Sequence, residues 1–256
     1  MSRLKQLFTE KTNICSVYYT AGYPNVEDTL PVLEALQNGG ADLVEIGMPF
    51  SDPLADGPTI QASSERALDN GMSIKLLFEQ LKNMRQSITM PIVLMGYFNP
   101  VFKYGVEAFI TQCKLVGVDG VIIPDLPFDE YCEKYQAFFE AAEVANIFLI
   151  TPQTSDERIQ LIDANSKGFI YVVSSASVTG VKKDLQQNQI DYFNRVNNLE
   201  LKTPRLIGFG ISNRSTFETA CQHASGAIIG SAFVKLLSES GADANKIKTF
   251  IESIKS

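Results

Sequence analysis

The chain has 256 residues, of which 45% are hydrophobic, enough to build a large core. Its formal net charge at pH 7 is −7, and the charges form no block of one sign. This balance excludes a general affinity for nucleic acids or anionic membranes. An anionic small molecule would therefore need a local binding site.

The sequence contains no apolar run near the roughly 20 residues of a membrane-spanning helix. Its first residues lack the apolar region of a secretory signal. The cysteines are far apart and have no metal-binding or redox spacing: Cys15, Cys113, Cys132 and Cys221. They indicate reduced thiols in a cytoplasmic protein. The lone His223 lacks ligand partners, so we predict no metal site.

Short apolar runs alternate with longer amphipathic segments along the chain. The predicted strands are 14–19, 42–46, 92–96, 119–123, 147–150, 169–173, 205–208 and 226–229. The predicted helices are 29–37, 59–68, 74–84, 106–115, 131–144, 156–164, 191–197, 216–222 and 245–254. Such alternation predicts an α/β fold with a parallel sheet. Eight units at this length favour one domain, 1–256, closed into a (β/α)8 TIM barrel. An additional N-terminal helix at 3–8 is expected to cover the bottom of the barrel.

The connection after the second predicted strand is long and proline-rich. The strand carries one acid, Glu45, and the loop that follows carries Asp56 before Gly57. A charge in a strand that is covered on both faces is costly unless it is paired, protonated or used. Two carboxyl groups are thus offered at one strand end. Two structural alternatives stay open, namely that Glu45 is satisfied by a neighbouring donor and that Asp56 forms a turn.

A second long connection, 174–190, follows the sixth predicted strand and contains small residues. Loops of this length in a compact domain are usually functional. The chemistry of barrel enzymes lies at the carboxyl ends of the strands, where both long loops begin.

Glycines follow the last three predicted strands, at Gly180, Gly210 and Gly230, the last beside Ser231. Glycine lets backbone amides approach an anion, and a helix N-terminus adds favourable polarity. A phosphate site after strands seven and eight is a recurrent feature of barrels. We therefore predict phosphate binding here.

Six motifs occur in a fixed order over essentially the whole chain: VEIGMPFSDPLADGPTIQ, MGYFNPVFKYG, PDLP, VTG, GFGIS and GAIIGSAFVK. With them the sequence resembles the tryptophan synthase alpha chain family. The resemblance makes Glu45 and Asp56 the catalytic pair and places Tyr171 beside the pocket. It assigns phosphate contacts to Gly180, Gly210, Gly230 and Ser231. One position departs from the pattern: Ser177 stands where the family more usually has glycine, which bears on the flexibility of that loop.

The resemblance implies retro-aldol cleavage of indole-3-glycerol phosphate to indole and glyceraldehyde 3-phosphate. Glu45 would protonate the indole ring at C3 and then accept the proton of the side-chain hydroxyl. Asp56 would accept the indole N–H. The chain itself would need no metal and no organic cofactor.

Aromatic side chains are expected to form a slot for the indole: Tyr18, Tyr97, Tyr171 and Phe209. Thr179 is expected to reach Asp56 when the loop after strand six closes. The resemblance also implies a pyridoxal-phosphate beta chain as partner in an alpha2-beta2 heterotetramer, with indole passing between the active sites. Docking would favour closed loops and faster turnover. Pro49, Asp52, Pro53 and Asn99 are predicted near that contact.

Two other functions compete with this lyase. A different phosphate-binding barrel, such as a sugar-phosphate isomerase or a pyrimidine-pathway decarboxylase, usually needs a lysine or histidine at a strand end, and none is well placed. A barrel that only binds a partner would need neither Glu45 nor Asp56.

Overall fold

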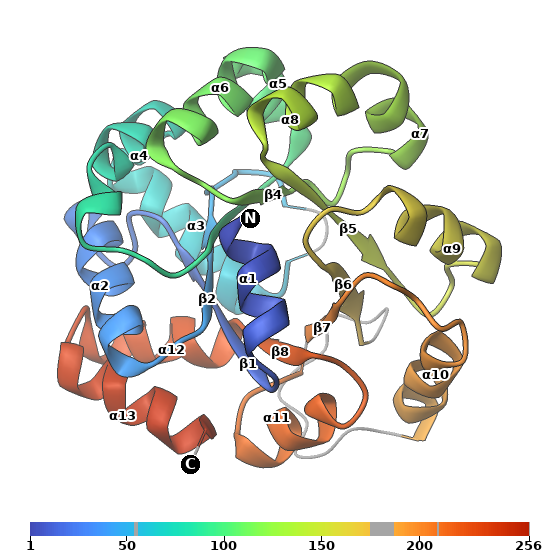
Figure 1. Ribbon diagram of the computed structural model, residues 1–256. Helices are drawn as coiled ribbons and strands as arrows, with labels where there is room; N and C mark the ends of the chain where they lie inside the picture. The colour runs from blue at the N-terminus through green and yellow to red at the C-terminus, as the bar shows by residue number, and fades with distance from the viewer. Residues whose placement is uncertain (54–55, 175–186, 209, 256) are drawn as a thin grey trace.

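A computed structural model describes residues 1–53, 56–174, 187–208 and 210–255. Its eight parallel strands close a barrel in chain order, which confirms the predicted (β/α)8 fold (Figure 1). The strands are β1 Ile14–Thr20, β2 Leu43–Gly47, β3 Ile92–Met95, β4 Gly120–Ile122, β5 Ala145–Ile150, β6 Ile170–Val173, β7 Arg205–Gly208 and β8 Gly226–Ile229.

One helix lies across an end of the barrel, and the other helices surround the barrel as a ring (Figure 1). The helices are α1 Arg3–Glu10, α2 Thr29–Gly39, α3 Pro58–Asp69, α4 Ile74–Leu81, α5 Phe98–Tyr104, α6 Val106–Val116, α7 Phe128–Glu130, α8 Gln136–Ala142, α9 Asp156–Asn165, α10 Gln187–Asn197, α11 Arg214–Cys221, α12 Ser231–Ser240 and α13 Ala244–Lys255. Short 3-10 turns lie at Val26–Asp28 and Met84–Gln86, and a π-helical turn lies at Tyr131–Tyr135.

The strands carry two separate apolar layers because successive side chains point to opposite faces. One layer packs between the sheet and the outer helices. The other fills the interior of the barrel, and we call it the lumen cluster: Ile14, Leu43, Val93, Ile122, Ala145, Ile147, Phe169, Tyr171, Val173, Leu206 and Ile228, with Leu4 and Leu7 of α1. The lumen is therefore a packed core, as is usual for this fold.

Helix α1 covers the amino end of the barrel, as the sequence predicts. Figure 1 views the molecule from this end, and α1 lies across the barrel opening. Ser2 caps the helix by accepting a hydrogen bond from the Lys5 amide. Leu4 and Leu7 are buried and join the lumen cluster. An N-terminal helix with one apolar face thus closes the end opposite to the expected site.

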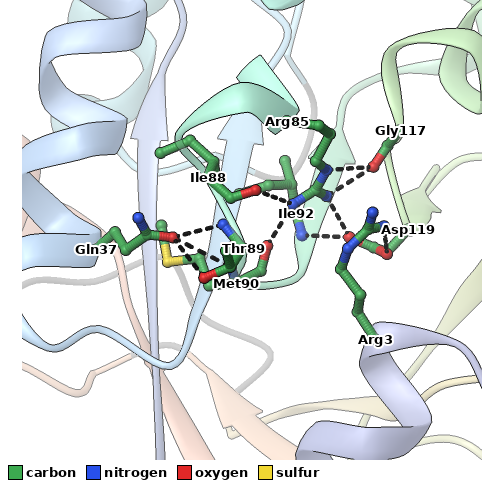
Figure 2. A network of polar contacts seen from close by, with 9 residues as sticks. All are labelled: Arg3, Gln37, Arg85, Ile88, Thr89, Met90, Ile92, Gly117 and Asp119. Carbon is green, nitrogen blue, oxygen red and sulfur yellow. Dashed lines mark hydrogen bonds and ion pairs between the residues drawn. The ribbon is translucent and has the colours of Figure 1, made fainter. Parts of the chain in front are cut away.

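An ion-pair network centred on the buried Asp119 fixes α1 to the barrel (Figure 2). Asp119, just before β4, accepts hydrogen bonds from Arg3 at 2.9 Å and from Arg85 at 2.6 Å. The same carboxylate accepts the Ile92 amide at 2.8 Å. Arg85 also donates to the Gly117 carbonyl at 2.6 Å. The network joins α1, the turn before β3 and the start of β4.

Several elements differ from the expected boundaries. The predicted helix 131–144 is divided into the π-helical turn and α8, and the short α7 directly precedes it. Helix α8 ends at Ala142, before the predicted boundary, because Glu143 adopts a left-handed conformation with φ 58°. Strand β5 then begins at Ala145. Helix α5 was not predicted, since it follows β3 after only two residues. Helix α10 begins four residues earlier than predicted.

Candidate active site

Glu45 points into the lumen of the barrel. It alternates along β2 with Leu43, a member of the lumen cluster, so both side chains lie on the inner face. Its neighbours in register are Tyr18 on β1 and Val93 on β3. The residue is 0% exposed. Burial raises the pKa of the Glu45 carboxyl to about 8, because a low-dielectric environment disfavours the charged form. At neutral pH this group is mostly protonated.

Among the residues that the structure describes, one hydrogen bond holds this carboxyl group. The Ser16 hydroxyl on β1 donates to Glu45 Oε1 at 3.1 Å. Glu45 Oε2 is buried and has no hydrogen-bond partner among the described residues. A buried acid with one satisfied oxygen and one unsatisfied oxygen is poorly explained as a purely structural group, because an unpaired polar atom is costly.

The Tyr18 side chain extends across the inner face of β2, from the level of Glu45 toward Gly47. A Cβ atom at Gly47 would overlap the Tyr18 hydroxyl, so the tip of the tyrosine lies against β2 one side-chain position nearer its carboxyl end. Gly47 is therefore needed to leave room for this ring. Burial raises the Tyr18 pKa above its usual value, and its hydroxyl stays protonated.

Asp56 lies in the loop after β2 and is half-buried. Its Oδ2 accepts a hydrogen bond from the Tyr97 hydroxyl at 3.0 Å. Burial raises the pKa of the Asp56 carboxyl, and the Tyr97 hydrogen bond opposes that rise because it favours the carboxylate. The loop leads into α3, whose first residue, Pro58, follows Gly57. Proline is favoured at the first position of a helix.

A small cavity lies beside this aspartate at the carboxyl end of the barrel. Its lining includes Tyr18, Met48, Phe50, Asp56 and Tyr97. The Phe50 and Tyr97 rings pack with their centroids 5.3 Å apart. The cavity thus has aromatic walls and one carboxylate.

Tyr171 on β6 is 4% exposed and belongs to the lumen cluster. Burial raises its pKa, and the charges of Glu45 and Asp56 raise it further. The Tyr171 hydroxyl is therefore within electrostatic range of both acids. As at Gly47, a Cβ atom on Gly208 would overlap this hydroxyl. Two strand-end glycines therefore leave space for two lumen tyrosines.

The carboxyl ends of β7 and β8 form an open surface with helix-terminal amides. Gly210 follows β7 with φ +80° and open space where a Cβ would lie. Gly230 directly precedes α12, which begins at the exposed Ser231. Within the described ranges, the Ser231 and Ala232 amides have no acceptor. Free amides at a helix N-terminus can bind an anion, and the phosphate site at these residues stays a prediction.

The structure brings only some of the predicted site residues together. Glu45, Asp56, Tyr18, Tyr97 and Tyr171 lie at the carboxyl end of the barrel or in the lumen just inside it. Thr179, Gly180, Phe209 and the atypical Ser177 lie outside the described residues. The residues predicted for a partner contact are exposed or partly exposed: Pro49, Asp52, Pro53 and Asn99.

The sequence prediction missed Ser16, Met48 and Phe50. Ser16 had a usable signal, because it stands two residues before Tyr18 on the same strand and therefore shares its face. Met48 and Phe50 resemble ordinary apolar residues in the sequence. Only the fold places them at the cavity.

Among the described residues, no group of three or more histidine, cysteine, aspartate or glutamate side chains could hold a metal ion. None of the helices in the described ranges is long and apolar enough to span a membrane. Fold and site together define a (β/α)8-barrel enzyme with two carboxyl groups and tyrosine hydroxyls at the carboxyl end of its strands.

Comparison with known proteins identifies the family. The family model of the tryptophan synthase alpha chain matches residues 4–255. The chain is 56% identical to the tryptophan synthase alpha chain of Flavobacterium johnsoniae, with 100% of both chains covered. It is 54% identical to that of Flavobacterium psychrophilum, covering 99% of this chain and 100% of the relative. The chain belongs to the tryptophan synthase alpha chain family.

Solved structures agree with this assignment. The chain is similar to a tryptophan synthase structure from Mycobacterium tuberculosis with a TM-score of 0.89 and 31% identity, covering 99% of this chain and 96% of the other. It is also similar to a tryptophan synthase complex from Pyrococcus furiosus with a TM-score of 0.85 and 35% identity, covering 95% and 98%. The function of the family is a lyase reaction of tryptophan biosynthesis, the cleavage of indole-3-glycerol phosphate.

Proposed function

We propose that Glu45 and Asp56 carry out the cleavage of indole-3-glycerol phosphate to indole and glyceraldehyde 3-phosphate, within one catalytic domain, 1–256. The observation that carries this assignment is the state of Glu45. It is fully buried in the lumen and mostly protonated at neutral pH, and one of its carboxyl oxygens has no partner in the described part of the chain. An acid in that state can give a proton to a bound ring.

Glu45 acts first as an acid. Its proton passes to C3 of the indole ring, and the ring becomes a positively charged indolenine. The resulting carboxylate, after reorientation, accepts the proton of the hydroxyl on the adjacent glycerol carbon. The carbon–carbon bond then breaks, its electron pair returns to the ring, and the hydroxyl carbon becomes an aldehyde. Such an acid–base group contributes about 10²–10⁴ in rate, equivalent to roughly 3–5 kcal/mol of barrier.

Asp56 stabilises the charge on the ring. Its carboxylate accepts the indole N–H, which becomes more acidic when C3 is protonated. The Tyr97 hydroxyl donates to Asp56 at 3.0 Å, which orients the carboxylate and favours its ionised form. Tyr18, Tyr97 and Phe50 enclose the ring, with Tyr171 beside the two acids. We place Phe209 in the same slot on sequence grounds, and Thr179 as a hydrogen-bond donor to Asp56.

The test is indole release by the purified chain supplied with indole-3-glycerol phosphate. We expect indole and glyceraldehyde 3-phosphate in equal amounts, without added metal. Absence of turnover by the chain, both alone and with its partner, would overturn the proposal.

The phosphate group is proposed to bind at Gly210, Gly230 and Ser231, with Gly180 completing the site. Gly210→Asp should weaken the binding of glycerol 3-phosphate by about 10- to 100-fold, because a negative charge would face the phosphate. Isothermal calorimetry measures this.

Gly210→Asn is the matched control for that substitution. Asparagine has the same size and also tolerates the left-handed φ of +80° at this position, but it carries no charge. Its effect should be much smaller. Equal losses in the two variants would show that the charge does not face the phosphate and would place the anion elsewhere.

We further propose that the chain works with a tryptophan synthase beta chain that carries pyridoxal phosphate, in an alpha2-beta2 assembly through which indole passes directly. The contact would lie on the loop after β2 and on α5, where Asp52 and Asn99 are exposed, next to the segment that delivers Asp56. All four cysteines are free thiols, which fits the cytoplasmic location that we propose.

Adding a purified beta chain should raise the rate of indole release, by about tenfold for each 1.4 kcal/mol by which docking favours the active state. Docking would favour closed loops that exclude water from the site. Asp52→Lys should weaken this activation. Asp243→Lys, between α12 and α13 at the opposite end of the barrel, is the control. Equal rates with and without the beta chain, together with no complex in sedimentation, would contradict the coupling.

A further inference from the structure

Ser16 is the buried polar side chain that contacts the proposed acid. It lies on β1, is 0% exposed, and its hydroxyl donates to Glu45 Oε1 at 3.1 Å. It shares the inner face of β1 with Tyr18 and lies two residues closer to the amino end. Nothing in the folding of a barrel strand requires a hydroxyl at this position, since its neighbours in register on β2 and β8, Leu43 and Ile228, are apolar lumen residues.

The donor–acceptor sense of this contact decides where the acid's proton lies. A protonated carboxyl group has one oxygen that carries the proton and one that only accepts. When the Ser16 hydroxyl is the donor to Oε1, the proton of the neutral acid lies on Oε2. Oε2 is the atom without a partner among the described residues, so none of these residues accepts its proton.

We propose that Ser16 is a positioning residue for the cleavage reaction: its hydroxyl holds Glu45 Oε1 so that Oε2 presents the transferable proton. This inference rests on the proposed role of Glu45. After the proton has left, the same hydroxyl stabilises the carboxylate that must take up the substrate's hydroxyl proton. Ser16 thus acts in both halves of the reaction without touching the substrate.

The groups that face Glu45 offer no substitute for this contact. Tyr18 of β1 and Tyr171 of β6 lie close enough for the charge of Glu45 to raise their pKa values, and burial keeps both neutral. Val93 of β3 is apolar. Asp56 in the loop after β2 interacts with both tyrosines. In the described part of the chain, Ser16 is the group that counteracts burial and lowers the Glu45 pKa.

The pH dependence of turnover tests this role. Glu45 must be protonated to act, so kcat/KM of the natural chain should fall as the pH rises through about 8. Ser16→Ala removes the donor that favours the carboxylate, so the alkaline limb should move up by about one pH unit. At the same time kcat should fall about 10- to 100-fold, because the carboxyl group loses its orientation. The infrared band of the protonated Glu45 carboxyl group can be identified by its absence in Glu45→Gln. The pH midpoint at which this band disappears should also move up in Ser16→Ala.

Two further variants separate positioning from packing. Ser16→Thr keeps the hydroxyl and should restore both the alkaline limb and most of kcat. Ser63→Ala removes another buried hydroxyl, which bonds to Thr20 and does not contact Glu45, and should leave the pH profile unchanged.

The outcomes distinguish this inference from the proposed function. If the pH profile and the infrared titration of Ser16→Ala equal those of the natural chain while Glu45→Gln is inactive, the role of Ser16 is overturned and Glu45 remains the acid. Normal turnover in Glu45→Gln overturns both. A shifted profile in Ser16→Ala that Ser16→Thr restores supports the inference.

Discussion

Glu45→Gln should reduce indole release by at least about 10²–10⁴-fold. Glutamine keeps the shape of the side chain and can still accept the Ser16 hydrogen bond, but it cannot give a proton to C3 of the indole ring. The substitution also removes an acid whose burial is costly, so the fold should be as stable as that of the natural chain or more so. Steady-state indole release and urea unfolding of the same preparation measure the two effects.

Asp56→Asn provides a comparison at the second carboxyl group. Loss of its negative charge should lower kcat by about 10²-fold if Asp56 stabilises charge on the ring, with the binding of glycerol 3-phosphate unchanged. A rise in KM alone would instead make Asp56 a residue that only positions the substrate. Glu133→Gln, an exposed change of the same chemical type, should have no effect.

Turnover of Glu45→Gln at the rate of the natural chain would exclude Glu45 from the mechanism.

The fold could be predicted from the sequence because its signal is repeated along the chain. Each strand is a short run rich in branched apolar residues, and each helix has one apolar face, so the order of elements and the closed barrel follow from the pattern. The boundaries were less accurate where local backbone conformation decides them. The early end of α8 depends on the left-handed conformation of Glu143, which no hydrophobic pattern reveals.

The acids of the site could be predicted because their residue types are unusual for their positions in the sequence. Glu45 is a charged residue in an apolar strand, and Asp56 stands in a proline-rich loop at a strand end. Ser16 is not unusual for its position, since a small polar residue is tolerated in a strand. Its importance depends on the register that places β1 beside β2. Likewise, the fit of Tyr18 over Gly47 depends on three-dimensional packing.

Asp119→Ala should lower the free energy of unfolding by about 3–5 kcal/mol, the usual cost of breaking a buried ion pair. Asp119 is 8% exposed and accepts from Arg3, Arg85 and the Ile92 amide, so its removal leaves the Arg85 charge and a buried backbone donor unpaired (Figure 2). Arg3 has a more exposed side chain, at 43%, so Arg3→Ala should cost much less. Urea unfolding followed by circular dichroism measures both losses.

This effect should be confined to stability, because Asp119 lies at the amino end of β4, opposite to the end that holds Asp56 and Tyr97. The turnover of the folded fraction, corrected by active-site titration with a substrate analogue, should stay near that of the natural chain. Asp129→Ala is the matched control, because it breaks an aspartate–arginine pair with Arg158 on the exposed surface and should change stability little. Equal destabilisation by Asp119→Ala and Asp129→Ala would contradict the role of the buried network. A large loss of turnover at unchanged stability would place Asp119 in communication with the site instead.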